Sequence, residues 1–388
     1  MAPTVLDALA CVSRLAIETV RLGGDRLSRR NSELPARVAD LTPAWLTSVL
    51  RRRWPGCRVR SHQLVTAHAG TTDRACIRLL YDRRPDGDEP PPDTLFIKLA
   101  PARASTRLFV NLLQLGRTEV EFYRRVAGDV AVDVPRVFHA ASGGTAQRFA
   151  LVLEDLGQRG ARFTNAGESL SLDDARQVMR ALAHLHAGFW DSPRLRTELS
   201  WLKSRDHNPD YRLERFLCAA ALPRGIRRFG DLVPPALQAA VPRLLAARDA
   251  LEEAWAEGPL TLIHGDAHAG NLYFLQRGVG LFDWQVVQRG QGMRDVSYFL
   301  ANSIPTELRR RHERELIELY LATLTARGVS PPGPPVAWQQ HRRHACYAFI
   351  GAAVTAAAAN LQSESIVRAG LARSAATVVD LDSIALLA

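Results

Sequence analysis

The densest group of polar residues in an apolar setting is the segment His264-Gly265-Asp266-Ala267-His268-Ala269-Gly270-Asn271. It follows Leu260 to Ile263, a short apolar run that predicts a buried strand. Its two glycines permit a tight loop. Twelve residues after Asn271 comes Asp283, in the segment Phe282-Asp283-Trp284-Gln285. Two carboxylates, of Asp266 and Asp283, and the amide of Asn271 therefore lie within a short stretch of the sequence.

The region after this loop predicts a hairpin whose strands are 271–275 and 279–284. Counted outward from the turn, Asn271 opens the first strand and Asp283 closes the second, almost opposite it. Both then lie at the open end of the hairpin, beside Asp266. Carboxylate and amide oxygens are hard ligands that suit Mg²⁺ carrying phosphates. An Asp followed five residues later by an Asn, with a further Asp on the next strand, is the pattern that phosphoryl transfer needs.

With these residues in view, the chain resembles the aminoglycoside phosphotransferase and choline-kinase-like families, including ecdysteroid-kinase-like members. The resemblance covers about residues 60 to 360 and is carried by Leu262 to Asp266, His268, Gly270-Asn271, Phe282 to Gln285 and Arg294-Asp295. It implies an α+β, bilobal protein-kinase-like fold, with a small β-sheet lobe containing one helix and a larger, mainly helical lobe. It also implies transfer of the γ-phosphoryl group of ATP, with Mg²⁺, to a hydroxyl of a small molecule.

The resemblance implies a role at each matching position. Asp266 would be the catalytic base, which orients the substrate hydroxyl and accepts its proton. Asn271 and Asp283 would hold Mg²⁺. Asp295 would brace the loop from below, and His264 would be structural.

Lysine occurs at only two positions, Lys98 and Lys203, in a chain that otherwise uses arginine. Lys98 lies in the apolar strand Leu95 to Leu99, and a buried lysine needs an anionic partner. In the resembling fold the corresponding lysine pairs with nucleotide phosphates and a helix glutamate. The alternative is a solubilising lysine on an edge strand.

Glu119 and Glu121 are the two candidate partners of Lys98, on a helix expected at about 106–127. The apolar face of this helix is marked by Leu115, Phe122 and Val126. Glu119 falls on that face at helical spacing, whereas Glu121 points elsewhere. An acid on an apolar face needs a buried cation, so the sequence predicts a pair between Lys98 and Glu119.

Two further segments match the family by their order along the chain. His68 to Arg74 joins the first two strands and would cover the phosphates, although it lacks a GxGxxG pattern and an ordinary turn is the alternative. Its candidate nucleotide-binding residues are Gly70, Thr71 and Thr72. The segment Leu151 to Leu156 resembles the interlobe hinge, where backbone groups near Glu154 and Leu156 would bind adenine.

Three regions would position these residues: an N-terminal helical extension over 1–57, a nucleotide-binding lobe over 58–153, and a catalytic and substrate-binding lobe over 154–388. The strands expected in the first lobe are 74–81, 94–99, 135–140 and 148–153. A Pro- and Asp-rich loop is expected over 83–93. Helices are expected to begin at the N-cap Thr42 and at the capping box of Ser171 and Asp174, and another to cover 235–256.

The composition limits the possible partners. The net charge is +10, but no basic stripe interleaved with aromatic residues is present, which argues against nucleic acid. Five cysteines without a CxxC pair favour a reducing, cytoplasmic location. The most apolar stretch, Ala345 to Ala359, is shorter than a membrane span. The oligomeric state is not indicated.

Two other functions remain open. His264, Asp266 and His268 alternate like the ligands of a metal-dependent hydrolase, but such a site needs further ligands, and His184 and His186 face different ways on one helix. A non-catalytic nucleotide-binding protein on a kinase fold is the second alternative, although every catalytic acid is retained. His268 could reach either substrate or backbone.

The acceptor is not identified by the sequence. Aminoglycosides are polycations and need an acidic pocket, whereas this chain is basic. Its C-terminal part is apolar and includes Tyr347, Phe349 and Ile350. These features favour a neutral, anionic or partly apolar alcohol.

Overall fold

The computed structural model describes residues 5–28, 34–85, 89–144, 147–165, 167–168, 170–208, 210–358 and 362–387. Residues 86–88 of the predicted loop and residues 1–4 and 29–33 of the predicted extension lie outside the described residues. The chain divides into two compact units. Unit 1 comprises Met1–Cys11, Asp129–Asp133 and Arg162–Ala388, and unit 2 comprises Val12–Gly128 and Val134–Ala161.

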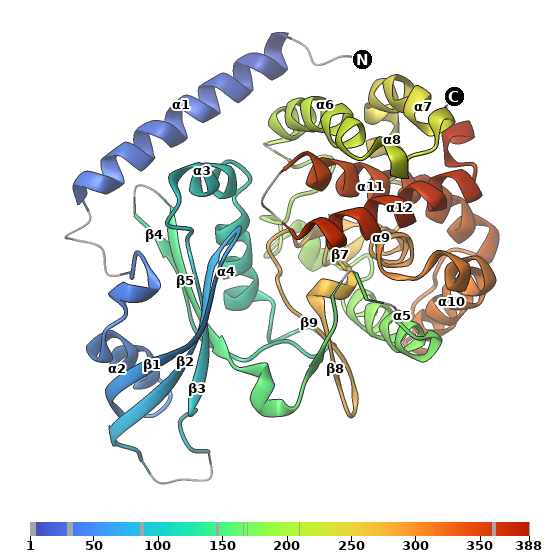
Figure 1. Ribbon diagram of the computed structural model, residues 1–388. Coiled ribbons are helices and arrows are strands. Elements are labelled where there is room, and N and C mark those ends of the chain that lie inside the picture. Colours follow the sequence, from blue (N-terminus) through green and yellow to red (C-terminus); the bar gives the residue numbers. More distant parts are fainter. Residues whose placement is uncertain are drawn as a thin grey trace. The chain divides into compact units, whose positions relative to one another are not determined.

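Unit 2 is built on a five-stranded antiparallel sheet of order β1-β2-β3-β5-β4 (Figure 1). Its strands are β1 (Arg58–Ala69), β2 (Asp73–Arg83), β3 (Thr94–Leu99), β4 (Val137–Gly143) and β5 (Arg148–Glu154). The four predicted strands are all present, and β3 has the predicted bounds. Besides the part of α1 (Val5–Ser28) from Val12 onward, the helices of this unit are α2 (Pro43–Leu50), α3 (Ala104–Leu112) and α4 (Leu115–Arg125), with the short 3-10 helices η2 (Val38–Asp40) and η3 (Leu156–Arg159).

Successive side chains of β3 point to opposite faces of the sheet, and this alternation determines which of them pack against α2. Leu95 and Ile97 belong to an apolar cluster that also contains Leu46 and Leu50 of α2. Because successive strand residues point to opposite faces, Lys98 points to the other side of the sheet. The α2 helix begins as predicted, since the side chain of its N-cap Thr42 accepts a hydrogen bond from the Trp45 N–H.

Two predicted helices are each divided in two. The helix expected at 106–127 is α3 followed by α4, because Gln114 has a left-handed backbone (φ 58°) that ends one helix and re-aims the next. The helix expected at 235–256 is α7 (Pro235–Ala246) followed by α8 (Arg248–Ala254). The break is at Ala247, whose ψ of 1° departs from helical geometry.

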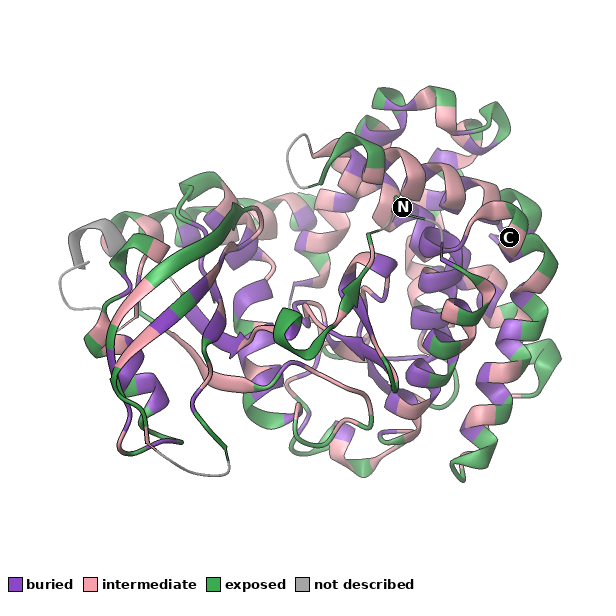
Figure 2. Ribbon diagram, turned by 60° about the horizontal axis from the view of Figure 1, so that its bottom comes forward, coloured by how far each residue is buried: buried purple, intermediate pink, exposed green. Residues whose placement is uncertain are grey.

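Unit 1 is mainly helical. Besides α7 and α8, its helices are α5 (Leu172–Ala187), α6 (Tyr211–Arg228), α9 (Met293–Ser303), α10 (Thr306–Ala326), α11 (Pro334–Ala357) and α12 (Glu364–Asp380), with the 3-10 helices η4 (Pro193–Arg196), η5 (Gly230–Leu232), η6 (Ala269–Asn271) and η7 (Ser383–Leu386). The predicted capping box of Ser171 and Asp174 begins α5. α11 packs against α6, α9 and α12, and buried residues follow the inner sides of these helices (Figure 2).

Five short strands hold the loops of unit 1. β6 (Arg162–Phe163), β8 (Leu272–Leu275) and β9 (Gly278–Leu281) form one antiparallel sheet, and β7 (Thr261–Ile263) pairs with β10 (Gln288–Gly290). The predicted hairpin is β8–β9, but it is shorter than predicted. Asn271 lies in η6 and Asp283 lies beyond β9, because the left-handed backbone of Asp283 (φ 65°) cannot continue a strand. The two residues therefore flank the hairpin.

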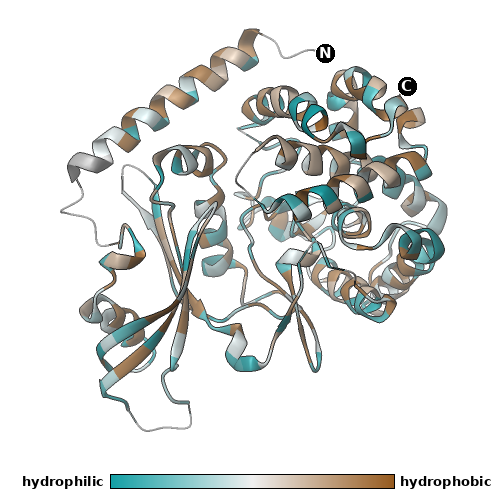
Figure 3. Cartoon of the chain, in the orientation of Figure 1, coloured by the Kyte–Doolittle hydropathy of each residue, from teal (hydrophilic) through white to brown (hydrophobic). Residues whose placement is uncertain are grey.

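The helix α1 (Val5–Ser28) carries apolar residues along its length (Figure 3). Those more than half exposed include Val5, Leu6, Leu9, Val12 and Val20. Within the described residues, no helix has the length and apolar character needed to cross a membrane. An antiparallel sheet unit and a helical unit make up the chain, so the predicted α+β class is confirmed. The predicted functional division at residues 57 and 153 stays a prediction.

Candidate active site

The loop between β7 and β8, residues 264–271, is held by a buried carboxylate. Asp295, in the first turn of α9, accepts hydrogen bonds from the His264 N–H (2.6 Å) and the Gly265 N–H (2.8 Å). Its side chain has no exposed surface. The geometry agrees with the predicted brace beneath the loop.

The brace is ionised. Burial would raise the pKa of Asp295, but the His186 ring, 3.3 Å away, and the Gly265 N–H outweigh burial and hold this pKa below its ordinary value. His186 is itself positioned by the Tyr320 hydroxyl at 2.9 Å. An anion with two backbone donors and an imidazole fixes the start of the loop in one conformation.

Glycine is required at position 265. Its φ is +84°, and a Cβ there would lie 2.4 Å from the Val286 carbonyl oxygen. The Gly265 carbonyl accepts a hydrogen bond from the Tyr347 hydroxyl (3.1 Å). Further along the loop, the Ala269 N–H donates to Ser303 Oγ, and the Ala269 carbonyl accepts from Thr164, each at 2.8 Å. Backbone groups along the loop are therefore satisfied by side chains from several elements.

Asp266 is the carboxylate that this rigid loop presents. Its side chain is 36% exposed, whereas Gly265 and Ala267 on either side are buried. Asn271 Nδ2 donates to the Asp266 carbonyl (2.9 Å) and to Asp266 Oδ2 (3.1 Å). Because both partners are acceptors, the amide nitrogen faces Asp266 and the amide oxygen of Asn271 points away from it.

His264 links the loop to the segment after β9. It is fully buried, and burial lowers its pKa, so the imidazole is neutral. Nε2 lies 3.0 Å from the Phe282 carbonyl, which can only accept, so Nε2 carries the proton. Nδ1 then accepts from the Asp266 N–H at 3.3 Å. Both ring nitrogens have backbone partners, and the ring packs on Trp284 at 4.6 Å.

His268 reaches the backbone, one of the two outcomes that the sequence left open. Its Nδ1 accepts a hydrogen bond from the Gly270 N–H at 3.0 Å. Its Nε2 lies 3.6 Å from Asp266 Oδ2. The ring therefore caps η6 and flanks the Asp266 carboxylate.

Asp283 is the second partly exposed carboxylate of this site. Its left-handed backbone turns the chain out of β9, while the next residue, Trp284, is fully buried. Gln285 Nε2 donates a hydrogen bond to Asp283 Oδ1. The Phe282 N–H donates to the Asn271 carbonyl at 3.1 Å, so Asp283 follows directly on the pairing that places Asn271. The unusual φ of Asp283 costs about 1 kcal/mol or more, which this anchoring must offset.

In unit 2, Lys98 and Glu119 form the predicted ion pair. Lys98 Nζ lies 2.8 Å and 2.6 Å from the two carboxylate oxygens of Glu119. Both side chains are at least 95% buried. Glu121 is half-buried and pairs instead with Arg125 at 2.6 Å. The argument from helix phase is confirmed by these contacts.

A glycine lets α4 approach the sheet closely enough for this pair. A Cβ at Gly116 would lie 2.2 Å from the ring of Phe149 on β5. Gly116 lies on the same face of α4 as Glu119, and in the β-ladder Lys98 pairs with Leu151 of β5. Any larger residue at position 116 would push α4 away from the strand beside Lys98.

The predicted phosphate-binding segment is the tight turn between β1 and β2. The Gly70 N–H donates to the Thr72 carbonyl at 3.1 Å, and Thr72 is buried. Gly70 and Thr71 are half-buried. The turn is present, and its role toward phosphates stays a prediction.

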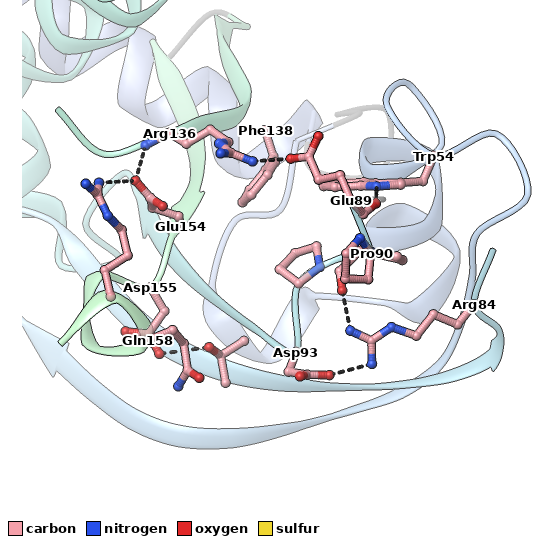
Figure 4. A pocket seen from close by; sticks show the side chains of 14 residues that line it. Trp54, Arg84, Glu89, Pro90, Asp93, Arg136, Phe138, Glu154, Asp155 and Gln158 are labelled. Atoms are coloured by element: carbon pink, nitrogen blue, oxygen red, sulfur yellow. Dashed lines mark hydrogen bonds and ion pairs between the residues drawn. The ribbon is translucent and has the colours of Figure 1, made fainter. Parts of the chain in front are cut away.

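The predicted hinge residue Glu154 borders a cavity of about 270 Å³ within unit 2 (Figure 4). Glu154 accepts from the Arg136 N–H (2.7 Å) and pairs with Arg159 (3.1 Å). Leu156 is buried at the start of η3. Among the other charged lining residues, Arg84 pairs with Asp93 and Arg136 with Glu89. Charge is thus largely balanced inside the cavity, and adenine binding at the hinge stays a prediction.

Three residues next to the loop were not predicted as part of the site. His186 joins Asp295 through the packing of α5 against β7, for which the sequence gives no local signal. Tyr298 follows Asp295 by one helical turn, and this spacing was a usable signal. Tyr347, noted only as apolar, contacts the loop through its hydroxyl.

Comparisons with known proteins agree with this arrangement. The model of the phosphotransferase enzyme family (APH) matches residues 93–330. No curated protein sequence matches the chain.

Solved structures share the fold at low identity. A microcompartment-associated aminopropanol kinase is 14% identical, with 86% of this chain and 96% of that chain covered and a TM-score of 0.50. A candidate aminoglycoside phosphotransferase from Ralstonia eutropha JMP134 is 13% identical, with coverages of 88% and 97% and a TM-score of 0.49. The GDP and kanamycin complex of an aminoglycoside 2''-phosphotransferase is 11% identical, with coverages of 79% and 89% and a TM-score of 0.47.

At these identities the structural likeness concerns the fold, which is that of the small-molecule kinases, as predicted. The family match covers well over half of the chain, and it includes Lys98, Glu119 and the whole of the loop that carries Asp266. The chain belongs to the phosphotransferase enzyme family.

Proposed function

We propose that this protein transfers the γ-phosphoryl group of ATP to a hydroxyl group of a small molecule. The observation that carries the proposal is Asp266, a partly exposed carboxylate on a loop whose backbone is held by buried side chains. A residue that must meet a substrate in one orientation needs such a rigid support. Family membership supports the same reaction class.

In this reaction the acceptor oxygen attacks the γ-phosphorus as the bond from that phosphorus to the β,γ-bridging oxygen breaks. ADP leaves, and the proton of the hydroxyl passes to Asp266. The Asn271 amide on Oδ2 fixes the carboxylate so that a lone pair is directed at the hydroxyl. Positioning and electrostatic stabilisation account for most of the catalysis in phosphoryl transfer, and a positioned base adds to them.

The donor set near Asp266 fits Mg²⁺. The amide oxygen of Asn271 points away from Asp266, and the Asp283 carboxylate is partly exposed. One amide oxygen and one carboxylate, completed by water and phosphate oxygens, are the ligands that Mg²⁺ prefers. When bound, the ion would neutralise charge on the phosphates. We propose Asn271 and Asp283 as its protein ligands.

Unit 2 would supply the nucleotide-binding residues. The buried Lys98 would bind phosphate oxygens while Glu119 holds its amine in place. The turn of Gly70, Thr71 and Thr72 would lie over the phosphates. Backbone groups near Glu154 and Leu156 would bind adenine.

The alternative functions are less well supported by the contacts. A hydrolase that used His264 as a metal ligand would need a nitrogen that His264 already gives to the Asp266 N–H or to the Phe282 carbonyl. A non-catalytic binding protein would have no need of an exposed, oriented Asp266. All five cysteines are free thiols, which supports our proposal of a cytoplasmic location.

The test is a panel of metabolite alcohols and antibiotics incubated with the protein, ATP and Mg²⁺, with each product weighed by mass spectrometry. We expect a gain of one phosphoryl group on at least one neutral, anionic or partly apolar alcohol, lost with EDTA and with Asp266→Asn. ATP that binds without any turnover would favour the non-catalytic alternative. Activity that requires Zn²⁺ and no nucleotide would favour the hydrolase.

A further inference from the structure

The helix α9 has one residue that is not buried. Every other residue from Met293 to Ser303 is buried, and only Tyr298 is partly exposed. Tyr298 follows Asp295 by three residues, so both lie on the same face of the helix. Asp295 holds the backbone of the loop, and the Tyr298 ring lies beside the His268 ring, whose Nε2 is 3.6 Å from Asp266 Oδ2. One helix thus contacts the backbone of the loop and the ring that flanks Asp266.

The Tyr298 ring is one member of an aromatic group beside Asp266. Its centroid lies 5.7 Å from that of Tyr347 and 6.4 Å from that of His268. Gly351 on α11 leaves room for it, since a Cβ there would lie 3.3 Å from Tyr298 Cε2. The ring is therefore fixed in position by its neighbours while part of its surface stays open.

Tyr347 extends this group away from the loop. Its hydroxyl donates to the Gly265 carbonyl, and the guanidinium of Arg294 lies 4.6 Å from its ring centroid. Burial raises the pKa of Tyr298 well above its ordinary value, and the Asp266 charge raises it further. Burial also raises the pKa of Tyr347 to about 12, against the opposing effect of Arg294. Both phenols are neutral hydrogen-bond donors near neutral pH.

We propose that Tyr298 is a positioning residue for Asp266 and that its open ring surface forms an uncharged, aromatic part of the acceptor site. The proposal rests on the proposed kinase function. Asn271 donates to Asp266 Oδ2, and in this proposal the Tyr298 hydroxyl is a second donor that would hold the carboxylate in a single orientation. The ring beside it fits an alcohol whose hydroxyl is attached to an apolar or planar body. Two neutral phenols, backed by Arg294, offer no carboxylate to a polycation.

The test compares Tyr298→Phe, Tyr298→Leu and the control Tyr211→Phe. Tyr211 lies in the same unit and its hydroxyl bonds a carboxylate, that of Asp249, but it belongs to α6 and to neither catalytic segment. Transfer is measured with the panel alcohol that the wild type phosphorylates fastest, as kcat and acceptor KM, together with the melting temperature. Tyr298→Phe should lower kcat about tenfold and leave the acceptor KM unchanged, because it loses only the hydroxyl. Tyr298→Leu should also raise the acceptor KM several-fold, and Tyr211→Phe should keep wild-type kinetics.

The outcomes separate this proposal from the reaction on which it rests. Wild-type transfer together with an unchanged kcat in Tyr298→Phe overturns the positioning role alone. Equal losses of kcat in Tyr298→Phe and Tyr211→Phe, in step with melting temperature, assign the effect to folding and overturn it too. If the wild type phosphorylates no alcohol of the panel and does not hydrolyse ATP, the kinase function is overturned, and this proposal with it.

Discussion

The two candidate catalytic regions are stabilised by different kinds of contact. The loop of residues 264–271 in unit 1 is fixed by side chains from several elements, among them Asp295, Ser303, Tyr347 and Thr164. Lys98 in unit 2 pairs with both carboxylate oxygens of the buried Glu119. The first region is supported by contacts from several elements to its backbone, and the second is built around a buried ion pair between side chains.

The difference matches the work proposed for each region. Asp266 must meet a hydroxyl in one orientation, and a partly exposed carboxylate holds an orientation only if its backbone cannot shift. Lys98 needs only to present a compact positive charge to phosphates, and a fully buried bidentate pair is enough for that. A buried charge also depends on its partner, so removing the Glu119 charge should disturb the position of the lysine.

Asp283→Ala should have the largest effect, because it removes a proposed ligand of Mg²⁺. Phosphoryl transfer should fall below detection, and binding of ATP with Mg²⁺ should weaken more than binding of ATP without the metal. Isothermal titration with and without Mg²⁺ measures the two affinities. Equal weakening in both titrations would point to misfolding, a real concern since the backbone of Asp283 is left-handed. Asp283→Asn, which tolerates that backbone, is the matched variant.

Asp266→Asn should lower kcat by about two orders of magnitude or more, because the amide cannot accept the proton of the hydroxyl. ATP affinity and melting temperature should stay close to those of the wild type, since the loop is held by its backbone and not by this side chain. Single-turnover kinetics measure the chemical step directly. A near-normal rate would remove Asp266 from the mechanism and leave the rigid loop without a catalytic purpose.

Asp295→Asn tests the support of the 264–271 loop, because it removes the carboxylate that accepts hydrogen bonds from the His264 and Gly265 N–H groups. An asparagine can accept one backbone N–H but presents its own amide hydrogens to the other, so stability should fall by about 2 kcal/mol or more. Urea denaturation measures the change. The exposed Asp231, which pairs with Arg368, provides the control, and Asp231→Asn should change stability by less than about 0.5 kcal/mol. Equal changes in the two variants would mean that the brace contributes nothing special.

The same variant should also change the response to acid. The pKa of Asp295 is lower in the folded protein than its ordinary value, so the folded state binds this proton less readily than the unfolded chain. The carboxylate then adds stability above the ordinary pKa of about 4, and this contribution is lost as the pH falls through the lowered value. The stability difference between wild type and Asp295→Asn should therefore shrink below about pH 4.

The two regions also differ in how far the sequence predicted them. That Asp266, Asn271 and Asp283 lie close together was predicted from one local segment, because a short loop followed by a hairpin leaves few ways to arrange neighbouring residues. The contact between Lys98 and Glu119 followed from helix phase and from the need of a lysine in an apolar strand for an anionic partner. Helix phase is a period that the backbone imposes in every α-helix.

What the sequence did not predict depends on packing between distant elements or on single backbone angles. His186 reaches Asp295 across 109 positions of the chain. The break at Gln114 and the turn at Asp283 each require a residue with a left-handed backbone, and a Gln or Asp in the sequence does not by itself predict a positive φ. These errors moved the ends of elements but left the faces of Glu119 and Asp266 unchanged.

The smallest effects are expected at the ion pair of unit 2, and they test directly whether Lys98 depends on Glu119. Lys98→Arg should raise the ATP KM by about tenfold, because a guanidinium is wider than an amine and spreads its charge over a plane. Glu119→Gln should do likewise, since a neutral amide no longer holds the lysine in place. Glu121→Gln is the matched control two residues away: Glu121 is half-buried and pairs with Arg125 at the helix surface, so its loss should be nearly silent. Initial-rate kinetics against ATP, with melting temperatures for each variant, measure all three. If Glu121→Gln proves as damaging as Glu119→Gln, the lysine does not depend specifically on its pair with Glu119, and the contrast between the two regions is lost.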